Sequence, residues 1–169
     1  MIDPSIKTIP TKKLIGINVH TSLSEFNPSV VWQKFMPRLK EIENKVGIEK
    51  YSIQIYDQLF SYDSFNPNVK FYYWAAIEVD DFSKIPHDMF SLEISSGKYA
   101  VFLHKGDMST FKKTLSYIYT KWLPSSGFKI GHRPHFEKLD EKYLGANNPN
   151  SQEEVWIPIR YKRFTIYSG

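Results

Sequence analysis

Hydrophobic and polar residues alternate near the end of the chain, in the stretch 153–159. Because successive side chains of a β-strand point to opposite faces, this pattern predicts a strand. One face carries three branched aliphatic residues and is expected to pack in the core. The other face carries Glu154, Trp156 and Pro158, which places a carboxylate two residues from a large indole. That combination suits an apolar pocket for a cationic or polarisable ligand.

The same alternation predicts six further strands, at residues 13–20, 51–56, 70–80, 89–95, 98–104 and 133–139. The strand at 70–80 has aromatic side chains on both faces, with Phe71 and Tyr73 on one and Tyr72 and Trp74 on the other. A face that only meets water seldom carries both a tyrosine and a tryptophan. We therefore expect either a ligand or another part of the fold to cover Tyr72 and Trp74.

Hydrophobic residues at helical spacing predict two helices. The first begins after Asn27 with Pro28 and is expected to end at Gly47. Its stripe comprises Trp32, Phe35, Leu39, Ile42 and Val46. Because proline removes an internal hydrogen bond, we expect a kink or a broken turn at Pro37. Ser109 is the expected cap of the second helix, whose stripe comprises Phe111, Leu115, Ile118 and Trp122.

The order strand, helix, strand, strand occurs twice, over residues 13–80 and again over residues 98–160. This repeat predicts an α+β fold with pseudo-twofold symmetry, in which the helices cover one side of a mostly antiparallel sheet. A cleft between the two halves would collect side chains from equivalent strands. The four side chains that the repeat places there are Tyr72, Trp74, Glu154 and Trp156.

Length and composition indicate a globular protein with one domain, over residues 1–169, with 41% hydrophobic and 24% charged residues. Aromatic residues make up 16% of the chain, which favours a pocket with aromatic walls. The net charge of +4 is not gathered into a dense basic run, so no nucleic-acid partner is expected. The chain has neither a signal-peptide pattern nor an apolar run of membrane-spanning length. We expect a cytoplasmic protein without a membrane partner.

Several classes of site find no support in the sequence. The chain has no cysteine, which excludes disulfides, thiolate nucleophiles and Cys-ligated zinc. His132 and His135 have a spacing found in metal sites, but Pro134 lies between them and no third ligand is near, so a pair of loop histidines is expected. The chain contains no nucleophile elbow and no glycine-rich phosphate loop. We expect neither a metal nor a cofactor.

Four motifs in order resemble the GyrI-like small-molecule-binding domain, also called the AraC effector-binding domain. The motifs are residues 97–106 (GKYAVFLHKG), 122–127 (WLPSSG), 133–137 (RPHFE) and 154–159 (EVWIPI). The resemblance runs from about residue 6 to residue 160. Each motif alone is a weak signal, but four in the same order are a strong one.

The resemblance implies a fold and a function. Family members have a duplicated β-α-β-β unit, here about residues 6–80 and about 89–160, which forms a curved antiparallel sheet with a ligand cleft between the halves. In drug-responsive activators the domain binds lipophilic, often cationic compounds, and stand-alone members include a gyrase inhibitor and hydrolases of cyclopropane-bearing genotoxins. The motif makes Glu154 the pocket carboxylate. Because the resemblance starts at the domain's first strand, we expect no DNA-binding module before it and no direct regulatory role on DNA.

Each candidate residue also has a structural interpretation. Glu154 is either a partly desolvated pocket acid or a solvated edge-strand glutamate, like its neighbour Glu153. Trp156 and Trp74 are either stacking walls for a ligand or parts of the sheet packing. Two tyrosines, Tyr72 and Tyr56, are weaker ligand candidates, for which packing is the ordinary explanation.

Two further candidates come from the remaining motifs. Tyr99 and His104 fall on opposite faces of their strand, so at most one of them looks into the cleft, and Tyr99 is the candidate. Glu137 fits the family motif, and a structural hydrogen bond is the main alternative to a contact with ligand.

The favoured hypothesis is a stand-alone protein that binds a lipophilic, cationic or planar small molecule in the cleft. Glu154 would supply the charge, and Trp74, Trp156 and Tyr72 would supply stacking. The first alternative is a hydrolase in which Glu154 activates a water molecule, and the second is a protein-interaction role like that of the gyrase inhibitor, with an unknown partner. An enzymatic function is less favoured than binding without catalysis.

Overall fold

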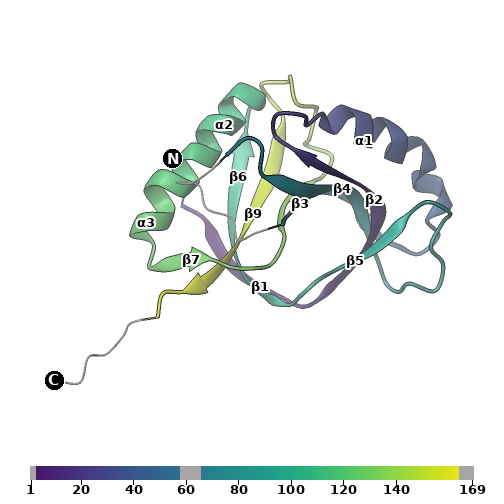
Figure 1. Ribbon diagram of the computed structural model, residues 1–169, viewed down its shortest axis with the longest axis horizontal. Helices are drawn as coiled ribbons and strands as arrows, with labels where there is room; N and C mark the ends of the chain where they lie inside the picture. Colours follow the sequence, from purple (N-terminus) through teal and green to yellow (C-terminus); the bar gives the residue numbers. More distant parts are fainter. Residues whose placement is uncertain (1–2, 58–65, 164–169) are drawn as a thin grey trace.

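The nine strands in the described part of the chain form an antiparallel sheet that curls into a half-barrel (Figure 1). The computed structural model describes residues 3–57 and 66–163. The strands are β1 (Ser5–Ile9), β2 (Lys12–Ser22), β3 (Lys45–Tyr56), β4 (Lys70–Val79), β5 (Phe90–Ile94), β6 (Gly97–Lys105), β7 (Phe128–Ile130), β8 (His135–Leu139) and β9 (Gln152–Tyr161). Of these, β1 and β7 are not among the strands predicted from the alternation; the seven predicted strands are all confirmed, with some shifts at their ends.

The strand order is β1-β6-β9-β8-β3-β4-β2-β5, with β7 paired to β9. The first half contributes β2-β4-β3 and the second contributes β6-β9-β8, so both halves have the same internal order. They meet where β3 pairs with β8, with Ser52 opposite Glu137. Each outer strand belongs to the other half, because β1 pairs with β6 and β5 pairs with β2. The predicted α+β architecture is confirmed.

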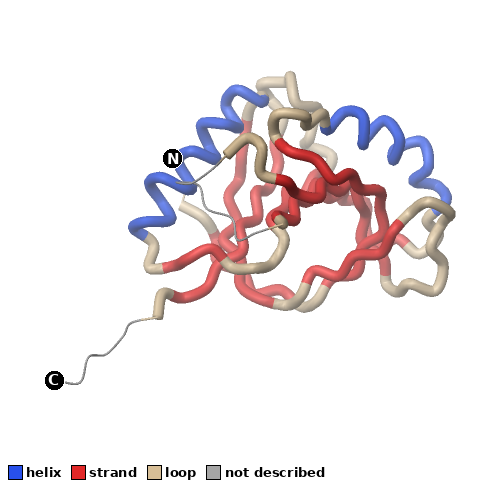
Figure 2. The backbone as a smooth tube through the Cα atoms, viewed as in Figure 1, coloured by secondary structure: helices blue, strands red, loops and turns tan. Residues whose placement is uncertain are grey.

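Two helical segments lie on the same side of the sheet and apart from one another, and the sheet curls away beneath them (Figures 1 and 2). The first consists of α1 (Pro28–Phe35) and the 3₁₀ helix η1 (Met36–Glu41). The second consists of α2 (Met108–Tyr117), the π-helical turn η2 (Ile118–Trp122) and α3 (Leu123–Ser125). Contacts join α1 to β2 and β4, and α2 to β6. No helix in the described part of the chain has the length and apolar character needed to cross a bilayer.

Two details of the predicted helices were wrong. The first helix does not reach Gly47, because the α-helix ends at Phe35 before Pro37, and the chain is already extended at Ile42. Val46 therefore lies in β3 and not on a helical stripe. The cap of α2 is Asp107 and not Ser109: the Asp107 carboxylate accepts the Thr110 backbone N–H at 3.0 Å.

Three hydrophobic clusters fill the fold. One lies inside the curl and draws on strands from both halves; its largest members are Tyr51, Trp74, Tyr99, Phe136 and Trp156. The second joins α1 to β2 and β4, and the third joins α2 and η2 to β6 and β9. We call the face inside the curl the inner face and the face on the side of the helices the outer face. Both faces of the central strands are therefore covered.

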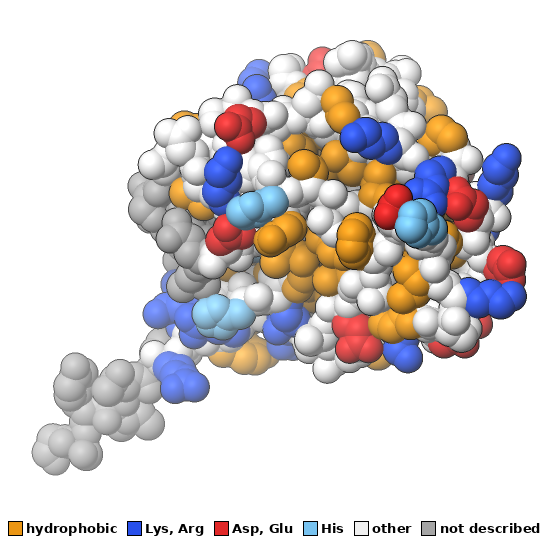
Figure 3. Space-filling model, turned by 45° about the vertical axis from the view of Figure 1, so that its right-hand side comes forward, with side chains coloured by type: hydrophobic (Ala, Val, Ile, Leu, Met, Phe, Trp, Pro, Cys, Tyr) orange, Lys and Arg blue, Asp and Glu red, His pale blue; other side chains and the backbone are white. Residues whose placement is uncertain are grey.

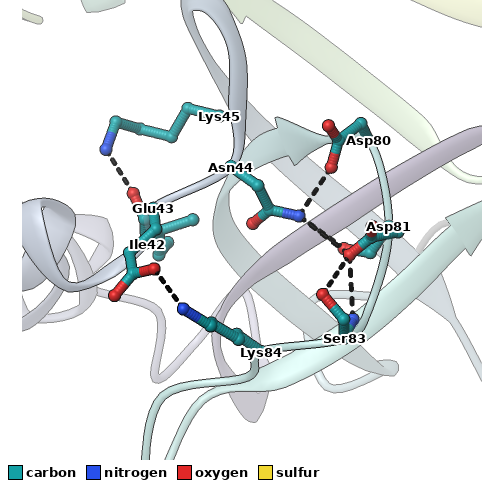
Figure 4. A network of polar contacts seen from close by, with 8 residues as sticks. All are labelled: Ile42, Glu43, Asn44, Lys45, Asp80, Asp81, Ser83 and Lys84. Atoms are coloured by element: carbon teal, nitrogen blue, oxygen red, sulfur yellow. Dashed lines mark hydrogen bonds and ion pairs between the residues drawn. The ribbon is translucent and has the colours of Figure 1, made fainter.

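A polar network fixes the corner where the chain leaves η1 and enters β3 (Figure 4). The side-chain amide of Asn44 donates to Asp80 Oδ1 at 2.7 Å and to the Asp81 carbonyl at 3.0 Å. The backbone N–H of Asp80 donates in return to the Asn44 carbonyl at 3.3 Å. Close by, Gly47 has a φ of +74° at the irregular start of β3. Asn44 thus ties the end of the helical segment to the end of β4.

Asn44→Ala is expected to lower the free energy of unfolding by about 1 kcal/mol, because the substitution leaves its acceptors without these donors. Denaturant unfolding monitored by circular dichroism measures the change. The matched control is Glu43→Ala, which removes an ion pair with Lys84 between side chains that are 65% and 70% exposed. That variant is expected to unfold like the wild type. Equal effects of the two substitutions would contradict the role given to Asn44.

Candidate functional site

The central strands present different side chains on their two faces. Register pairing places Ser52 opposite Glu137 and Ile53 opposite Phe136 on adjacent strands, so the first pair shares one face and the second pair shares the other. Ile53 and Phe136 belong to the cluster inside the curl, which makes theirs the inner face. Ser52 and Glu137 consequently lie on the outer face, between the strands that α1 covers and those that α2 covers.

The predicted site residues divide between these two faces. Five of them lie on the inner face: Tyr72, Trp74, Tyr99, Glu154 and Trp156. The other two, Tyr56 and Glu137, lie on the outer face. The structure therefore does not bring all seven together, because alternation along β3 and β8 points Tyr56 and Glu137 away from the inside of the curl.

Most of the predicted residues on the inner face are engaged in packing. The Trp156 ring is 5% exposed and stacks on Phe136 with a centroid distance of 5.1 Å. Its indole N–H donates to Glu154 Oε2 at 3.0 Å. The hydroxyl of the fully buried Tyr99 donates to the Pro134 carbonyl at 2.9 Å. The Glu154 carboxylate therefore holds a core indole in place.

The outer face carries two carboxyl groups among tyrosines. We call this set the acidic-aromatic cluster; its members are Tyr56, Tyr73, Glu137, Tyr143 and Glu153. Tyr56 lies on β3, Tyr73 on β4, Glu137 on β8 and Glu153 on β9. Tyr143 lies in the segment between β8 and β9. Their mutual electrostatic effects, described below, indicate that they are neighbours. Tyr73 packs beneath α1, whereas Tyr56 and Glu137 lie on β3 and β8 in the middle of the sheet.

Glu137 is the most enclosed acid of the cluster, with 9% of its surface exposed. Gln54 on the adjacent strand donates its amide N–H to Glu137 Oε2 at 3.0 Å. Burial raises the pKa of Glu137 to about 7, although the hydrogen bond from Gln54 lowers that pKa in part. Glu137 is therefore close to half ionised at neutral pH.

Glu153 is the second acid of the cluster. Val155 pairs with Glu137, so Glu153, two residues earlier on the same face of β9, is its diagonal neighbour. Burial raises the pKa of Glu153 to about 8, and repulsion by Glu137 adds to this shift. No lysine or arginine within residues 3–57 and 66–163 forms an ion pair with either carboxyl. The cluster thus holds two acids without a countercharge from the described chain.

The aromatic members are oriented by hydrogen bonds or by burial. The Trp32 indole on α1 donates to the Tyr73 hydroxyl at 2.7 Å, and this hydroxyl lies 2.8 Å from Ser52 Oγ. Burial raises the pKa of Tyr143, and the carboxyls of Glu153 and Glu137 raise it further. Burial likewise raises the pKa of Tyr56, with Glu137 as the second cause. These hydroxyls stay protonated and can donate hydrogen bonds.

His135 lies next to this cluster in β8, where the sequence predicted a loop histidine. The Tyr119 hydroxyl of η2 is 3.1 Å from His135 Nδ1, and the Tyr56 ring meets the imidazole edge-on at 5.4 Å. Burial lowers the pKa of His135 to about 3. The imidazole is therefore neutral at physiological pH and does not balance the charge of the two acids.

Sequence reasoning gave Glu153 a solvated position and favoured a structural role for Glu137. A signal for Glu153 was present in the alternation itself, because Glu153 shares its face with Val155 and Ile157, which are core residues. A charged residue that shares a face with core residues is expected to be enclosed if its strand is a central strand of the sheet. The sequence does not reveal that β9 lies between β6 and β8.

Glu137→Gln is expected to make the fold more stable than the wild type above pH 7 and equally stable near pH 4. An acid whose pKa is raised on folding binds its proton more tightly in the folded state. The wild type therefore loses stability as pH rises from about 4.5 to about 7, by about 3 kcal/mol, and the variant lacks this loss. Denaturant unfolding of both proteins at pH 4, 6 and 8 measures the difference. A difference that does not depend on pH would contradict the enclosed position of the carboxyl.

Comparison with known proteins decides the family. The model of the GyrI-like small molecule binding domain matches residues 2–160. The chain belongs to the GyrI-like family. The prediction of this family from the four sequence motifs is thereby confirmed. This GyrI-like chain is a small-molecule-binding domain related to those of transcription regulators.

Relatives of this GyrI-like chain include regulators. The transcriptional regulator BrlR of Pseudomonas aeruginosa is 30% identical over 152 residues, which cover 89% of this chain and 53% of BrlR. The probable transcriptional regulator YgiV of Escherichia coli K12 is 31% identical over 70 residues, covering 40% of this chain and 42% of YgiV. The chain spans about half the length of the curated relatives it matches.

A solved structure shares the whole GyrI-like fold. SAV2435 bound to tetraphenylphosphonium superposes with a TM-score of 0.71 at 15% identity, covering 94% of both chains. At this level of identity the likeness is evidence for the fold alone. It agrees with the curled sheet and the two helical segments described above.

Proposed function

We propose that this GyrI-like protein binds a lipophilic organic cation on the outer face, between the two helical segments, with Glu137 as the countercharge. The observation that carries the proposal is the acidic-aromatic cluster, which holds one buried and one half-buried carboxyl without a cationic partner in the described chain. An enclosed carboxylate is costly unless a cation or hydrogen bonds compensate it. A bound cation would provide that compensation.

The aromatic members of the cluster support a cationic and apolar ligand. Tyrosine rings attract a cation through their faces, and the interaction strengthens where water is excluded. A rigid cation without N–H donors would contact Tyr56 and Tyr143 through its apolar surface and Glu137 through its charge. The tetraphenylphosphonium in the SAV2435 structure is a ligand of this kind, which supports the same class for this chain.

Binding of such a cation is expected to release protons near neutral pH. Glu137 and Glu153 have pKa values of about 7 and about 8 without ligand, and a nearby positive charge lowers the pKa of a carboxyl. Affinity for the cation should therefore rise with pH between 6 and 8.5, because removing the proton from these carboxyls costs less free energy at higher pH.

Isothermal titration calorimetry with tetraphenylphosphonium tests the proposal. The expected result is one saturable site, tighter binding at pH 8.5 than at pH 6, and proton release that is detected by repeating the titration in buffers of different ionisation enthalpy. Triphenylphosphine oxide, a neutral phosphorus compound with three phenyl rings in place of four, is the control and should bind at least tenfold more weakly. Equal affinity for the two compounds would overturn the role of the carboxyls.

Hydrolysis is a second candidate function, favoured by the pKa of about 7 at Glu137. A carboxyl with this pKa is suited to act as a general base at neutral pH. In that case Glu137, and not Glu154, would activate the water, since Glu154 accepts the Trp156 indole N–H. Incubation with a cyclopropane-bearing alkylating agent, followed by chromatography of the ring-opened product, tests it. A rate equal to that in Glu137→Gln protein would exclude this activity for that substrate.

A further inference from the structure

One end of the molecule gathers cations without acids. Residues 108–136 and 155–163, which include the second helical segment, β7 and most of β9, hold eight of the 22 Lys and Arg residues and none of the 18 Asp and Glu residues. The rest of the chain consequently has a formal charge of −4, although the whole chain has +4. Figure 3 shows several Lys and Arg side chains and a histidine together at the lower left, the end that carries β7 in Figure 1.

The cations of this end meet where β7 pairs with β9. Lys129 lies directly opposite Arg160 in that pairing, so two positive side chains are nearest neighbours. Lys162 Nζ reaches back to the Pro124 carbonyl at the end of the helical segment, at 3.2 Å. Among the residues that the structure describes, no carboxylate forms an ion pair with Lys129, Arg160 or Lys162. An anion bound here would reduce the repulsion between these cations.

A row of aromatic rings runs through the same end, from the helical segment to the surface. Trp122 of η2 stacks on Phe128 of β7 with a centroid distance of 6.3 Å. Phe128 in turn meets Tyr161 of β9 at 5.3 Å. Tyr161 is 66% exposed, and the ammonium nitrogen of Lys98 lies 5.5 Å from its ring centroid. The outermost ring thus lies among cations, with most of its surface open to solvent.

We propose that this end of the protein binds single-stranded nucleic acid. We call the set the basic-aromatic end; its members are Lys98, Phe128, Lys129, Arg160, Tyr161 and Lys162. The cations contact successive phosphates, and the exposed ring of Tyr161 stacks on an unpaired base. Proteins that bind single strands without sequence preference combine these two features. An acidic protein segment would match the cations but not the exposed ring, and a duplex keeps its bases stacked on one another.

The basic-aromatic end is distinct from the acidic-aromatic cluster. The two sets share no residue, and they attract ligands of opposite charge. The basic-aromatic end lies where β7 pairs with β9, whereas the acidic-aromatic cluster lies around the junction of β3 and β8. The sequence contains no dense basic run because Lys98, Lys129 and Arg160 are far apart along the chain. Strand pairing and the contact of Lys98 with Tyr161 bring them to one end.

Fluorescence anisotropy of a labelled oligothymidylate of about 12 nucleotides tests the proposal on the full chain. The expected result is saturable binding that weakens as salt is raised from about 50 to about 200 mM. The logarithm of the association constant should fall against the logarithm of the salt concentration with a slope of about −2, as about three contacted phosphates would give. Complete independence of salt would contradict the role of the cations.

Reversal of two charges locates the site. The double substitution Lys129→Glu and Arg160→Glu should weaken binding at least tenfold and make the salt dependence less steep. The matched control is Lys34→Glu with Lys40→Glu, which makes the same change in net charge at two exposed lysines of the first helical segment. It should bind within twofold of the wild type. Circular dichroism and thermal unfolding verify that both variants are folded.

Substitution of Tyr161 tests the stacking. Tyr161→Ala should bind oligothymidylate about tenfold more weakly, which lies within the range for one stacked base. Tyr161→Phe keeps the ring and should bind like the wild type. An abasic oligonucleotide of the same length has the phosphates without the bases, so its affinity should be lower than that of oligothymidylate and equal in the wild type and in Tyr161→Ala.

Three results would overturn the proposal. The first is the absence of saturable binding at about 50 mM salt. The second is an equal loss in the two charge-reversed double variants, which would show that net charge and not this end attracts the strand. The third is an affinity for polyglutamate of similar length that equals the affinity for oligothymidylate, which would make an acidic protein the partner.

Discussion

Glu137→Gln is expected to weaken the binding of tetraphenylphosphonium at pH 8 about 100-fold, or about 3 kcal/mol. The substitution keeps the size of the side chain and its contact with Gln54 but removes the charge. Loss of one partner from an enclosed charge pair costs about 2–5 kcal/mol. At pH 8 the wild-type carboxyl, with a pKa of about 7, is mostly ionised, so the comparison is made where the charge contributes most. Calorimetric titration of both proteins measures the ratio.

Two features make this result interpretable. The variant is expected to be at least as stable as the wild type at this pH, so unfolding does not account for weaker binding. The matched control is Glu154→Gln, on the inner face, which removes a charge that holds the Trp156 indole and should leave the affinity within twofold of the wild type. If Glu154→Gln lost the binding and Glu137→Gln kept it, the cation would bind on the inner face.

Phe136→Ala is expected to have the largest effect on stability, with the free energy of unfolding lowered by about 3–5 kcal/mol. Phe136 is 1% exposed and lies at the centre of the inner face. Its ring stacks on Trp156 at 5.1 Å and meets Tyr51 and Tyr99 at 5.6 and 5.3 Å. The cavity left by the ring would border three large side chains that cannot collapse into it together. Denaturant unfolding followed by tryptophan fluorescence and circular dichroism measures the loss.

Leu103→Ala is the control for this prediction. Leu103 also lies on the inner face, on β6, but it is 53% exposed. Truncation there removes little buried surface and is expected to change the free energy of unfolding by less than about 0.5 kcal/mol. Similar losses in the two variants would show that the centre of the curl is not the tightly packed region described here.

The sequence predicted the fold well because the patterns are local. Alternation along β4 and β9 assigned each side chain to a face, and these assignments agree with the structure. The end of the first helix was predicted too late because Ile42 and Val46 continue the apolar spacing, whereas Pro37 and the network at Asn44 end the helix earlier. That network joins residues about 36 positions apart, which periodicity does not reveal.

The candidate site was harder to predict because both faces of the central strands are enclosed. Alternation separates Glu154 from Glu153 but does not indicate which of the two meets a hydrophobic partner and which meets another acid. The pairing of β8 with β9 decides this, by setting Glu153 diagonal to Glu137 and Trp156 opposite Phe136. Such pairings arise from strand order, and strand order is a property of the whole chain.

The outer strands β1 and β5 are exchanged between the two halves, and this exchange holds the halves together. Since β1 completes the sheet of the second half and β5 completes that of the first, neither half can detach without removing a strand from the other. The two halves are thus interlocked, and partial opening of one half breaks backbone hydrogen bonds in both.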